Sequence, residues 1–371
     1  MNKKLRIVQY GCGKMSKYTM RYIYEKGAKV VGAFDINPKV IGKDIGTIIG
    51  CEDKGVLVSD AKDAKKILRE LKPDACVVET MSLLSDLDEI LTICAELGIN
   101  AITTCEEAFF SWNSNPTLTM KIDKLAKKNK CTIAGSGYQD IYWGQLISSI
   151  CGSTQSIKKI IGESWYNVED YGIALAEAHG AGLTLKEFDE KIASADRMSS
   201  EERQELINAG TFLPSYMWNV NGWLCDKLDL NVKSQKQECI PETYDKDIKS
   251  STLGMTIKAG DATGMSAVVT TETEEGITLV TKCVGKVYAP DEFDINEWTV
   301  EGEPNTTITV QRPATVELTC ATIVNRIPDL INARPGFVPT AEFGDLQFKR
   351  NHLEKFVKWS YQTIYPIKEE S

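Results

Sequence analysis

The feature that most constrains this chain is a glycine-rich turn within its first 35 residues. Residues 5–10 (LRIVQY) form an apolar run, GCGKMS follows, a helix-like stretch ends at Gly27, and the run AKVVGAFD closes on Asp35. A strand, a glycine turn, a helix and a strand that ends on an acid form the dinucleotide-binding unit of Rossmann folds. Because GCG alone would equally describe an ordinary turn, the flanking pattern carries this prediction.

The same alternation continues to about residue 150. The strand-like runs DACVVET, INAITT and CTIAG are separated by helix-like segments that begin near Ser59, near Ser85 and after Pro116. Strands separated by helices of this length imply right-handed crossovers and a parallel sheet. We therefore predict an α/β chain in which residues 1–150 form an NAD(P)-binding Rossmann domain on a doubly wound parallel sheet.

The pattern changes beyond about residue 150. The runs SIKKIIGESWYNV, GMSAVVTTETEEGITLVTKCVGKVYA and NTTITVQRPATVELTCATIV resemble antiparallel strands, and residues 184–230 resemble helices. Residues 151–324 are predicted to form a second α+β domain on a mainly antiparallel sheet, for substrate binding and dimerisation. Residues 325–345 are predicted to pack back on the first domain, and residues 345–371 to form a C-terminal extension.

Composition limits the partners of the chain. The net charge is −9 and the sequence pI is about 5.1, whereas proteins that bind nucleic acid need clustered Lys and Arg. No run approaches the roughly 18 apolar residues that span a membrane. Eleven scattered cysteines without C-x-x-C pairs fit unbridged thiols in a reducing compartment. We expect a cytoplasmic protein that binds neither nucleic acid nor membrane.

The glycine turn predicts where a cofactor binds. Gly11 and Gly13 occupy the first two positions of G-x-G-x-x-G, which permit the tight turn and the approach of a pyrophosphate, and Ser16 stands at the third. Asp35 would accept hydrogen bonds from the ribose hydroxyls and repel a 2′-phosphate, so NAD is favoured. NADP stays possible because Lys39 and Lys43 follow closely. The candidate cofactor-binding residues are Gly11, Gly13, Lys14, Met15, Asp35, Thr80 and Thr104.

Two adjacent carboxylates follow the strand-like run INAITT. Glu106 and Glu107 are placed at the carboxyl end of that strand, where open α/β sheets bind their ligands. They are the candidate catalytic residues, although acids at a helix N-terminus would show the same pattern. Many sugar dehydrogenases of similar architecture have Glu-Lys-Pro at this place with the lysine as proton donor, and Glu107-Ala108 here argues against that mechanism.

Several strings together resemble one family. VQYGCGKM, GAFDINPKVIGKDIG, GINAITTCEE, VEGEPN and IVNRIPDLINARPGF are similar to the 2,4-diaminopentanoate dehydrogenases and native amine dehydrogenases, whose N-terminal domain resembles dihydrodipicolinate reductase. The resemblance implies NAD(P)-dependent oxidative deamination of a small amino or diamino acid, reversible as reductive amination, in a homodimer whose C-terminal sheets pair. It also implies that Glu106 or Glu107 contacts the substrate nitrogen.

The sequence departs from that family around the predicted substrate pocket. GSGYQDIYW stands where the family has Asn-Pro, and GESWYNVEDYG lacks the arginines of the family strand. A substrate carboxylate could be held by Arg326 or Arg334, although a surface ion pair is the simpler interpretation of Arg334. His179 could contact substrate or serve an ordinary loop. The candidate substrate residues are Tyr138, Gln139, Trp143, His179 and Arg334.

Other functions remain compatible with the residues alone. The same fold could reduce a C=N bond, oxidise an alcohol, or bind NAD as a catalytically silent sensor. The chain has only two histidines, which excludes a histidine-pair metal site, and we expect no metal.

Overall fold

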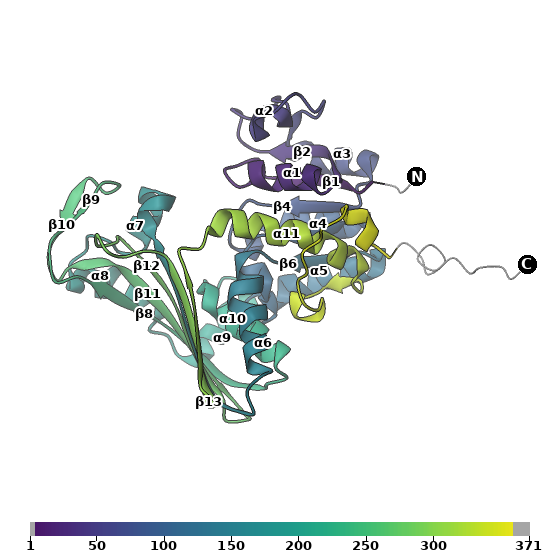
Figure 1. The fold of residues 1–371 in the computed structure, drawn as a ribbon. Coiled ribbons are helices and arrows are strands. Elements are labelled where there is room, and N and C mark those ends of the chain that lie inside the picture. Colours follow the sequence, from purple (N-terminus) through teal and green to yellow (C-terminus); the bar gives the residue numbers. More distant parts are fainter. Residues whose placement is uncertain (1–3, 359–371) are drawn as a thin grey trace, which may run out of the picture. The chain divides into compact units, whose positions relative to one another are not determined.

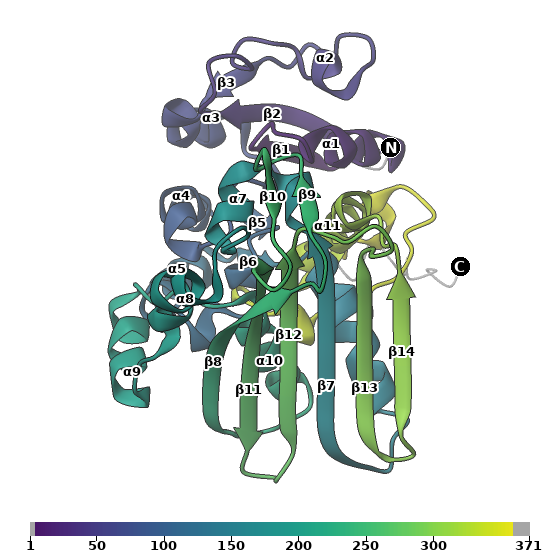
Figure 2. The ribbon, with the colours of Figure 1, turned by 90° about the vertical axis from the view of Figure 1, so that its left-hand side faces the viewer.

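The computed structural model describes residues 4–358, which divide into two compact units (Figures 1 and 2). Of the described residues, the first unit contains 4–111, 117–141 and 315–358, and the second contains 112–116 and 142–314. Part of the C-terminal extension predicted from the sequence, residues 359–371, lies outside the described residues.

The first unit is built on a seven-stranded sheet in the order β15-β6-β5-β4-β1-β2-β3. Every strand pair in it is parallel, which confirms the predicted Rossmann architecture. The strands are rich in Val, Ile and Ala because both faces of a parallel sheet are buried. They are β1 (Arg6–Tyr10), β2 (Lys29–Asp35), β3 (Val58–Asp60), β4 (Ala75–Val78), β5 (Asn100–Thr103), β6 (Thr132–Gly135) and β15 (Gly336–Phe337).

Helices connect and cover these strands. They are α1 (Ser16–Glu25), α2 (Ile45–Ile49), α3 (Ala64–Leu71), α4 (Asp88–Leu97), α5 (Pro116–Asn129) and α11 (Thr315–Asn332). Helix α11 packs against α1 and against β4, β5 and β6. Its buried residues Ile323, Ile327 and Leu330 recur at intervals of three and four, as one face of a helix requires.

The structure differs from the sequence-based prediction at the start of α11. The segment 315–324 (TVELTCATIV) was predicted to be a strand because β-branched residues favour strands, yet it forms the first half of this helix. Burial against α1 and the sheet outweighs the modest intrinsic preference of Thr, Val and Ile. Residues 315–358 therefore belong to the first unit.

The second unit is built on a six-stranded sheet in the order β14-β13-β7-β12-β11-β8. Its neighbouring strands are antiparallel except for β12 and β7, which confirms a mainly antiparallel sheet. The strands are β7 (Ser156–Asn167), β8 (Val232–Thr243), β11 (Ala262–Thr273), β12 (Thr278–Lys286), β13 (Ile295–Glu303) and β14 (Thr306–Gln311). A separate hairpin pairs β9 (Ile248–Ser250) with β10 (Met255–Ile257).

The two faces of this sheet differ in burial among the described residues. Along β7, Ile160, Gly162 and Ser164 are buried, whereas the alternate residues Ile161 and Glu163 stay partly exposed. Helix α10 packs on the buried face, through β8, β11 and β12. Figure 2 views the sheet with α10 behind it. The helices are α6 (Leu146–Cys151), α7 (Ile173–Ala178), α8 (Leu185–Lys191), α9 (Ser200–Ala209) and α10 (Tyr216–Lys227).

Within residues 4–358, no helix has the length and apolar character needed to cross a membrane.

Candidate functional site

The strand order of the first unit reverses between β1 and β4. Tyr10 at the end of β1 pairs with Val78 at the end of β4, and the chain then continues to β2 on one side and to β5 on the other. Open α/β sheets bind ligands outside the carboxyl ends of their strands at such a switch point. Thr103 pairs with Val78, and Gly135 with Thr103. The segments after β1, β4, β5 and β6 therefore share one edge.

The two glycines of the turn are required for different reasons. Gly11 has a φ of +93°, and a Cβ there would lie 2.2 Å from the carbonyl oxygen of Glu79. The protein itself therefore requires glycine at this position. A Cβ on Gly13 would meet no described atom within 4 Å. Packing in the described chain therefore does not require glycine at position 13.

The remaining candidate cofactor residues surround this turn. Lys14 is exposed, and Met15 precedes α1, whose buried Ser16 donates a hydrogen bond to Gly13 O at 2.8 Å. Thr80 is exposed just beyond β4, and Thr104 is partly buried just beyond β5, with its backbone N–H donating to Val78 O at 3.2 Å. All of these residues lie at the carboxyl edge of the sheet.

Asp35 connects the turn to the end of β2. Its Oδ2 accepts a hydrogen bond from Cys12 N at 2.7 Å, and its Oδ1 accepts one from Asn37 N at 2.7 Å. The carboxylate is partly exposed, as are acids that bind a ribose, while Lys39 and Lys43 are exposed. Asp35 thus holds the backbone of the turn and places a carboxylate at the end of β2.

Glu106 and Glu107 have different environments. Glu106 is partly exposed, and desolvation raises the pKa of its carboxyl, an effect that a hydrogen bond with Ser82 partly offsets. Glu107 is buried, and its Oε2 accepts a hydrogen bond from Leu84 N at 2.7 Å. That contact caps the first turn of the short helix η2 (Leu84–Leu87). The two carboxyls therefore differ in burial and in hydrogen-bond partners, and both stay candidate catalytic residues.

Tyr138 and Gln139 follow β6 at the same edge, and both are buried. The backbone N–H of Tyr138 donates to Thr319 Oγ1 at 3.2 Å, and Gln139 Nε2 donates to Ser136 O at 2.9 Å. These contacts fix the loop that leads from β6 into the π-helix η5 (Asp140–Gln145).

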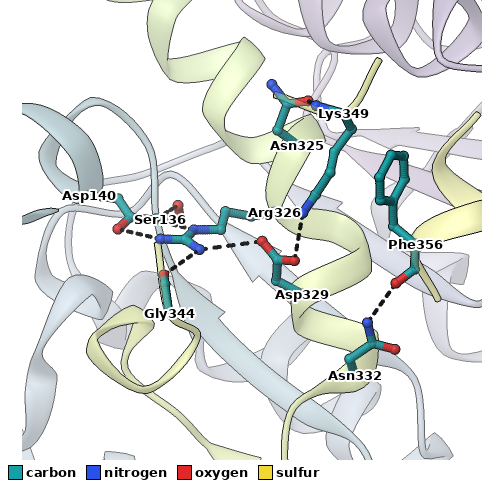
Figure 3. A network of polar contacts seen from close by, with 9 residues as sticks. All are labelled: Ser136, Asp140, Asn325, Arg326, Asp329, Asn332, Gly344, Lys349 and Phe356. Carbon is teal, nitrogen blue, oxygen red and sulfur yellow. Dashed lines mark hydrogen bonds and ion pairs between the residues drawn. The ribbon is translucent and has the colours of Figure 1, made fainter. Parts of the chain in front are cut away.

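A buried ion-pair network fastens this loop to α11 (Figure 3). The guanidinium of Arg326 bonds Asp140 Oδ2 at 2.8 Å and Oδ1 at 3.2 Å, and both side chains are fully buried. Arg326 also contacts Asp329 at 3.3 Å and donates to Gly344 O at 3.0 Å. The prediction that Arg326 could hold a substrate carboxylate is wrong. The donors of its guanidinium are buried and occupied within the protein.

Arg334 lies at the opposite edge of the sheet. It precedes β15, whose first residue, Gly336, pairs with the first residue of β6, Thr132. Its guanidinium forms a bidentate ion pair with Glu342, at 2.7 Å and 2.5 Å. Both side chains are half-exposed. This geometry supports the surface ion pair and removes the argument for contact with a substrate at the carboxyl edge.

The other two candidate substrate residues belong to the second unit. Trp143 is buried and stacks on Tyr216 with ring centroids 6.5 Å apart. His179 Nε2 lies 2.6 Å from Tyr166 Oη, and its Nδ1 lies 2.8 Å from Leu175 O. Burial lowers the pKa of His179. Both ring nitrogens therefore have protein partners, and the geometry supports the structural interpretation of His179.

Sequence reasoning missed one residue of the site, Glu79. It directly follows β4 and is buried, and burial raises the pKa of its carboxyl to about 7. Its carboxyl oxygens accept hydrogen bonds from Gln9 Nε2 at 2.8 Å and from Thr19 Oγ1 at 2.6 Å. The only signal in the sequence is an acid at the end of an otherwise apolar run, DACVVET, which also describes an exposed strand end.

Among residues 4–358, no three His, Cys, Asp or Glu side chains gather to hold a metal, and the cysteines form no disulfide.

A glycine turn at the switch point of a parallel sheet, with an acid at the end of β2, defines a Rossmann-type NAD(P)-dependent oxidoreductase. Residues 5–107 match the family model described as dihydrodipicolinate reductase, N-terminus. A solved amine dehydrogenase from Mycobacterium smegmatis is 36% identical, with a TM-score of 0.81 and coverage of 94% of this chain and 98% of that chain. The chain belongs to the amine dehydrogenase family.

A second relative supports the assignment to the amine dehydrogenase family. The chain is 24% identical to a 2,4-diaminopentanoate dehydrogenase from Acetoanaerobium sticklandii over 378 residues, which covers 96% of this chain and 100% of the relative. A probable dehydrogenase from Thermotoga maritima shares the fold at 13% identity, with a TM-score of 0.55 and 92% of each chain covered. The chain is an NAD(P)-dependent dehydrogenase of the amine dehydrogenase type.

Proposed function

We propose that this enzyme catalyses the reversible oxidative deamination of a small amino or diamino acid with NAD, and that Glu106 is its catalytic carboxylate. The proposal rests on the position of Glu106, a partly exposed residue at the edge that bears the glycine turn, and on the raised pKa of its desolvated carboxyl. A raised carboxyl pKa at the ligand-binding edge of a sheet is typical of a proton-transfer group.

The reaction needs such a group. Hydride can leave an amine-bearing carbon only when the nitrogen lone pair is available, yet an aliphatic amine has a pKa near ~10 and is largely protonated at neutral pH. The ionised Glu106 carboxylate accepts that proton and passes it to solvent, and the regenerated carboxylate then stabilises the positive charge of the iminium. Water adds to the iminium carbon, and ammonia leaves as the carbonyl product forms. A bound nicotinamide supplies the hydride acceptor. In the reverse direction Glu106 orients ammonia and stabilises the same cation.

The relatives support a small amino or diamino acid as the substrate. Tyr138, Gln139 and Trp143 remain candidate substrate residues. The curated relative is named for a diamino acid. We expect kcat/KM for NAD reduction to be at least about tenfold higher with small diamino or amino acids than with alkyl amines of the same length. Steady-state assays across such a panel test this, and equal or better turnover of the alkyl amines would show that no carboxylate is recognised.

We expect NAD to bind more tightly than NADP, on the order of tenfold or more, because the Asp35 carboxylate would face the 2′-phosphate. Calorimetric titration of both cofactors measures the ratio. Equal or tighter NADP binding would contradict the role of Asp35. In that case Lys39→Ala and Lys43→Ala would identify the compensating cation, since both lysines are exposed near the turn.

We propose a homodimer formed through the open face of the six-stranded sheet. Ile161 and Val280 are paired on adjacent central strands and are partly exposed on this face, and Val268 of β11 lies on the same face. Covering such positions with a second copy removes apolar surface from water. Sedimentation should show a dimer at micromolar concentration, and Ile161→Asp should shift it toward monomer. A wild-type protein that sediments only as a monomer would rule the proposal out.

A further inference from the structure

Glu79 contacts the glycine turn through both its backbone and its side chain. Its backbone N–H donates to Tyr10 O at 2.8 Å, and its carbonyl oxygen occupies the space that a Cβ on Gly11 would need. Its carboxyl is bridged to the turn by Gln9, whose Nε2 donates both to Glu79 Oε2 at 2.8 Å and to Gly11 O at 2.9 Å. The other carboxyl oxygen accepts from Thr19 of α1 at 2.6 Å. The carboxyl thus connects β1, the turn and the first helix.

No cation among the described residues contributes to the pKa of this carboxyl, and the hydrogen bonds from Gln9 and Thr19 only partly offset the effect of burial. Among the described residues, this carboxyl acts electrostatically on the thiols of Cys12 in the turn and Cys320 on α11, and the pKa of each is raised to about 12, so both are uncharged. The negative charge of Asp35 helps to raise the pKa of the Cys12 thiol, and that of Glu317 helps to raise the pKa of the Cys320 thiol. Neither acid supplies a positive charge. Burial without a cation favours the protonated carboxyl, in agreement with its pKa of about 7.

We propose that Glu79 is a positioning residue of the glycine turn that must be protonated for tight dinucleotide binding, so that the cofactor binds together with a proton. This inference rests on the turn being the dinucleotide site. A protonated Glu79 keeps its hydrogen bonds to Gln9 and Thr19 and adds no charge beneath the turn. An ionised Glu79 places a negative charge under the backbone that receives the pyrophosphate, and the two repel.

The direction of the pH effect follows from linkage. Because the bound pyrophosphate favours the protonated carboxyl, the pKa of Glu79 is higher in the complex than in the free protein. The dissociation constant of NADH is then constant below the pKa of the free protein and rises with pH above it. A pKa increase of about one unit in the complex corresponds to a tenfold loss of affinity at high pH.

The experiment measures NADH binding by fluorescence and calorimetry from about pH 6 to about pH 8.5. We expect wild-type affinity to fall about tenfold across this range, with net proton uptake in buffers of different ionisation enthalpy. Glu79→Gln keeps the shape of the side chain without its charge and should bind NADH with nearly constant affinity and less proton uptake. Glu96→Gln removes a carboxylate that is paired with Lys65 on the surface, and it should behave as wild type.

Glu106 also has a raised pKa, and the difference between wild type and Glu79→Gln isolates the contribution of Glu79. A wild-type affinity that does not change with pH, or the same pH profile in Glu79→Gln, would overturn the inference. Gly13→Val tests separately whether the cofactor binds at the glycine turn, because a Cβ at position 13 would meet no described atom within 4 Å. It should abolish NADH binding at every pH while the protein stays folded, and unchanged binding would place the cofactor elsewhere.

Discussion

Glu106→Gln should lower kcat for amine oxidation by roughly 10² to 10⁴ while the affinity for NAD hardly changes. Gln keeps the size and hydrogen-bonding shape of the side chain but can neither accept the substrate proton nor offset the charge of the iminium. The pH dependence of the wild-type rate should also reveal the titration of the Glu106 carboxyl. Because the carboxylate must be ionised to act as a base, the rate of oxidation should decline as the pH falls through the raised pKa of Glu106. Steady-state kinetics and cofactor titration on the same preparations measure both effects.

The neighbouring carboxylate is the matched control. Glu107 is buried and accepts a hydrogen bond from Leu84 N, which Gln can also accept. Glu107→Gln should therefore lower turnover far less than Glu106→Gln. A larger loss in Glu107→Gln would move the catalytic role one residue along the chain, and near wild-type rates in both variants would refute the mechanism.

Arg326→Met should destabilise the protein by about 3–5 kcal/mol, since it leaves the buried Asp140 carboxylate without its cation. The first unit should unfold at lower denaturant concentration, because the loop after β6 and helix α11 lose the contact that joins them. Chemical denaturation followed by circular dichroism measures the change in the free energy of unfolding.

Two further variants identify the cause of that loss. Arg334→Met breaks a half-exposed ion pair with Glu342 and should cost no more than about 1 kcal/mol. The double variant Arg326→Met with Asp140→Leu removes both buried charges and should recover most of the stability. If Arg326→Met were as mild as Arg334→Met, the buried pair would not be what holds the loop to α11.

Local patterns predict the fold of the first unit well. The glycine turn, the acid that ends β2 and the regular alternation of strands and helices are encoded within short segments, so Gly11, Gly13 and Asp35 could be placed before the structure was known. The pairing of β7 with β12 could not be predicted, because these parallel strands lie more than one hundred residues apart in the sequence. The start of α11 was mistaken for a strand because tertiary packing outweighs β-propensity.

The chemical environment of the side chains was much harder to predict. Nothing near Arg326 in the sequence shows that its guanidinium meets Asp140, which lies 186 residues earlier. The partners of His179 and the opposite-edge position of Arg334 likewise depend on contacts formed only in the fold. Glu79 was missed for the same reason, since its significance comes from burial beneath the turn. Residue type and spacing identify an edge of the sheet, whereas burial and hydrogen-bond partners decide which side chains can act there.

In the proposed reaction, the enzyme oxidises a carbon that bears an amino group, and ammonia is released. Parallel assays of NADH formation and ammonia release, with matched amino, diamino and hydroxy acids, test it most directly. We expect one ammonia to be released for each NADH formed from an amine substrate, both signals to be lost in Glu106→Gln, and the hydroxy acids not to be turned over. NADH formation from the hydroxy acids alone, without ammonia, would contradict it.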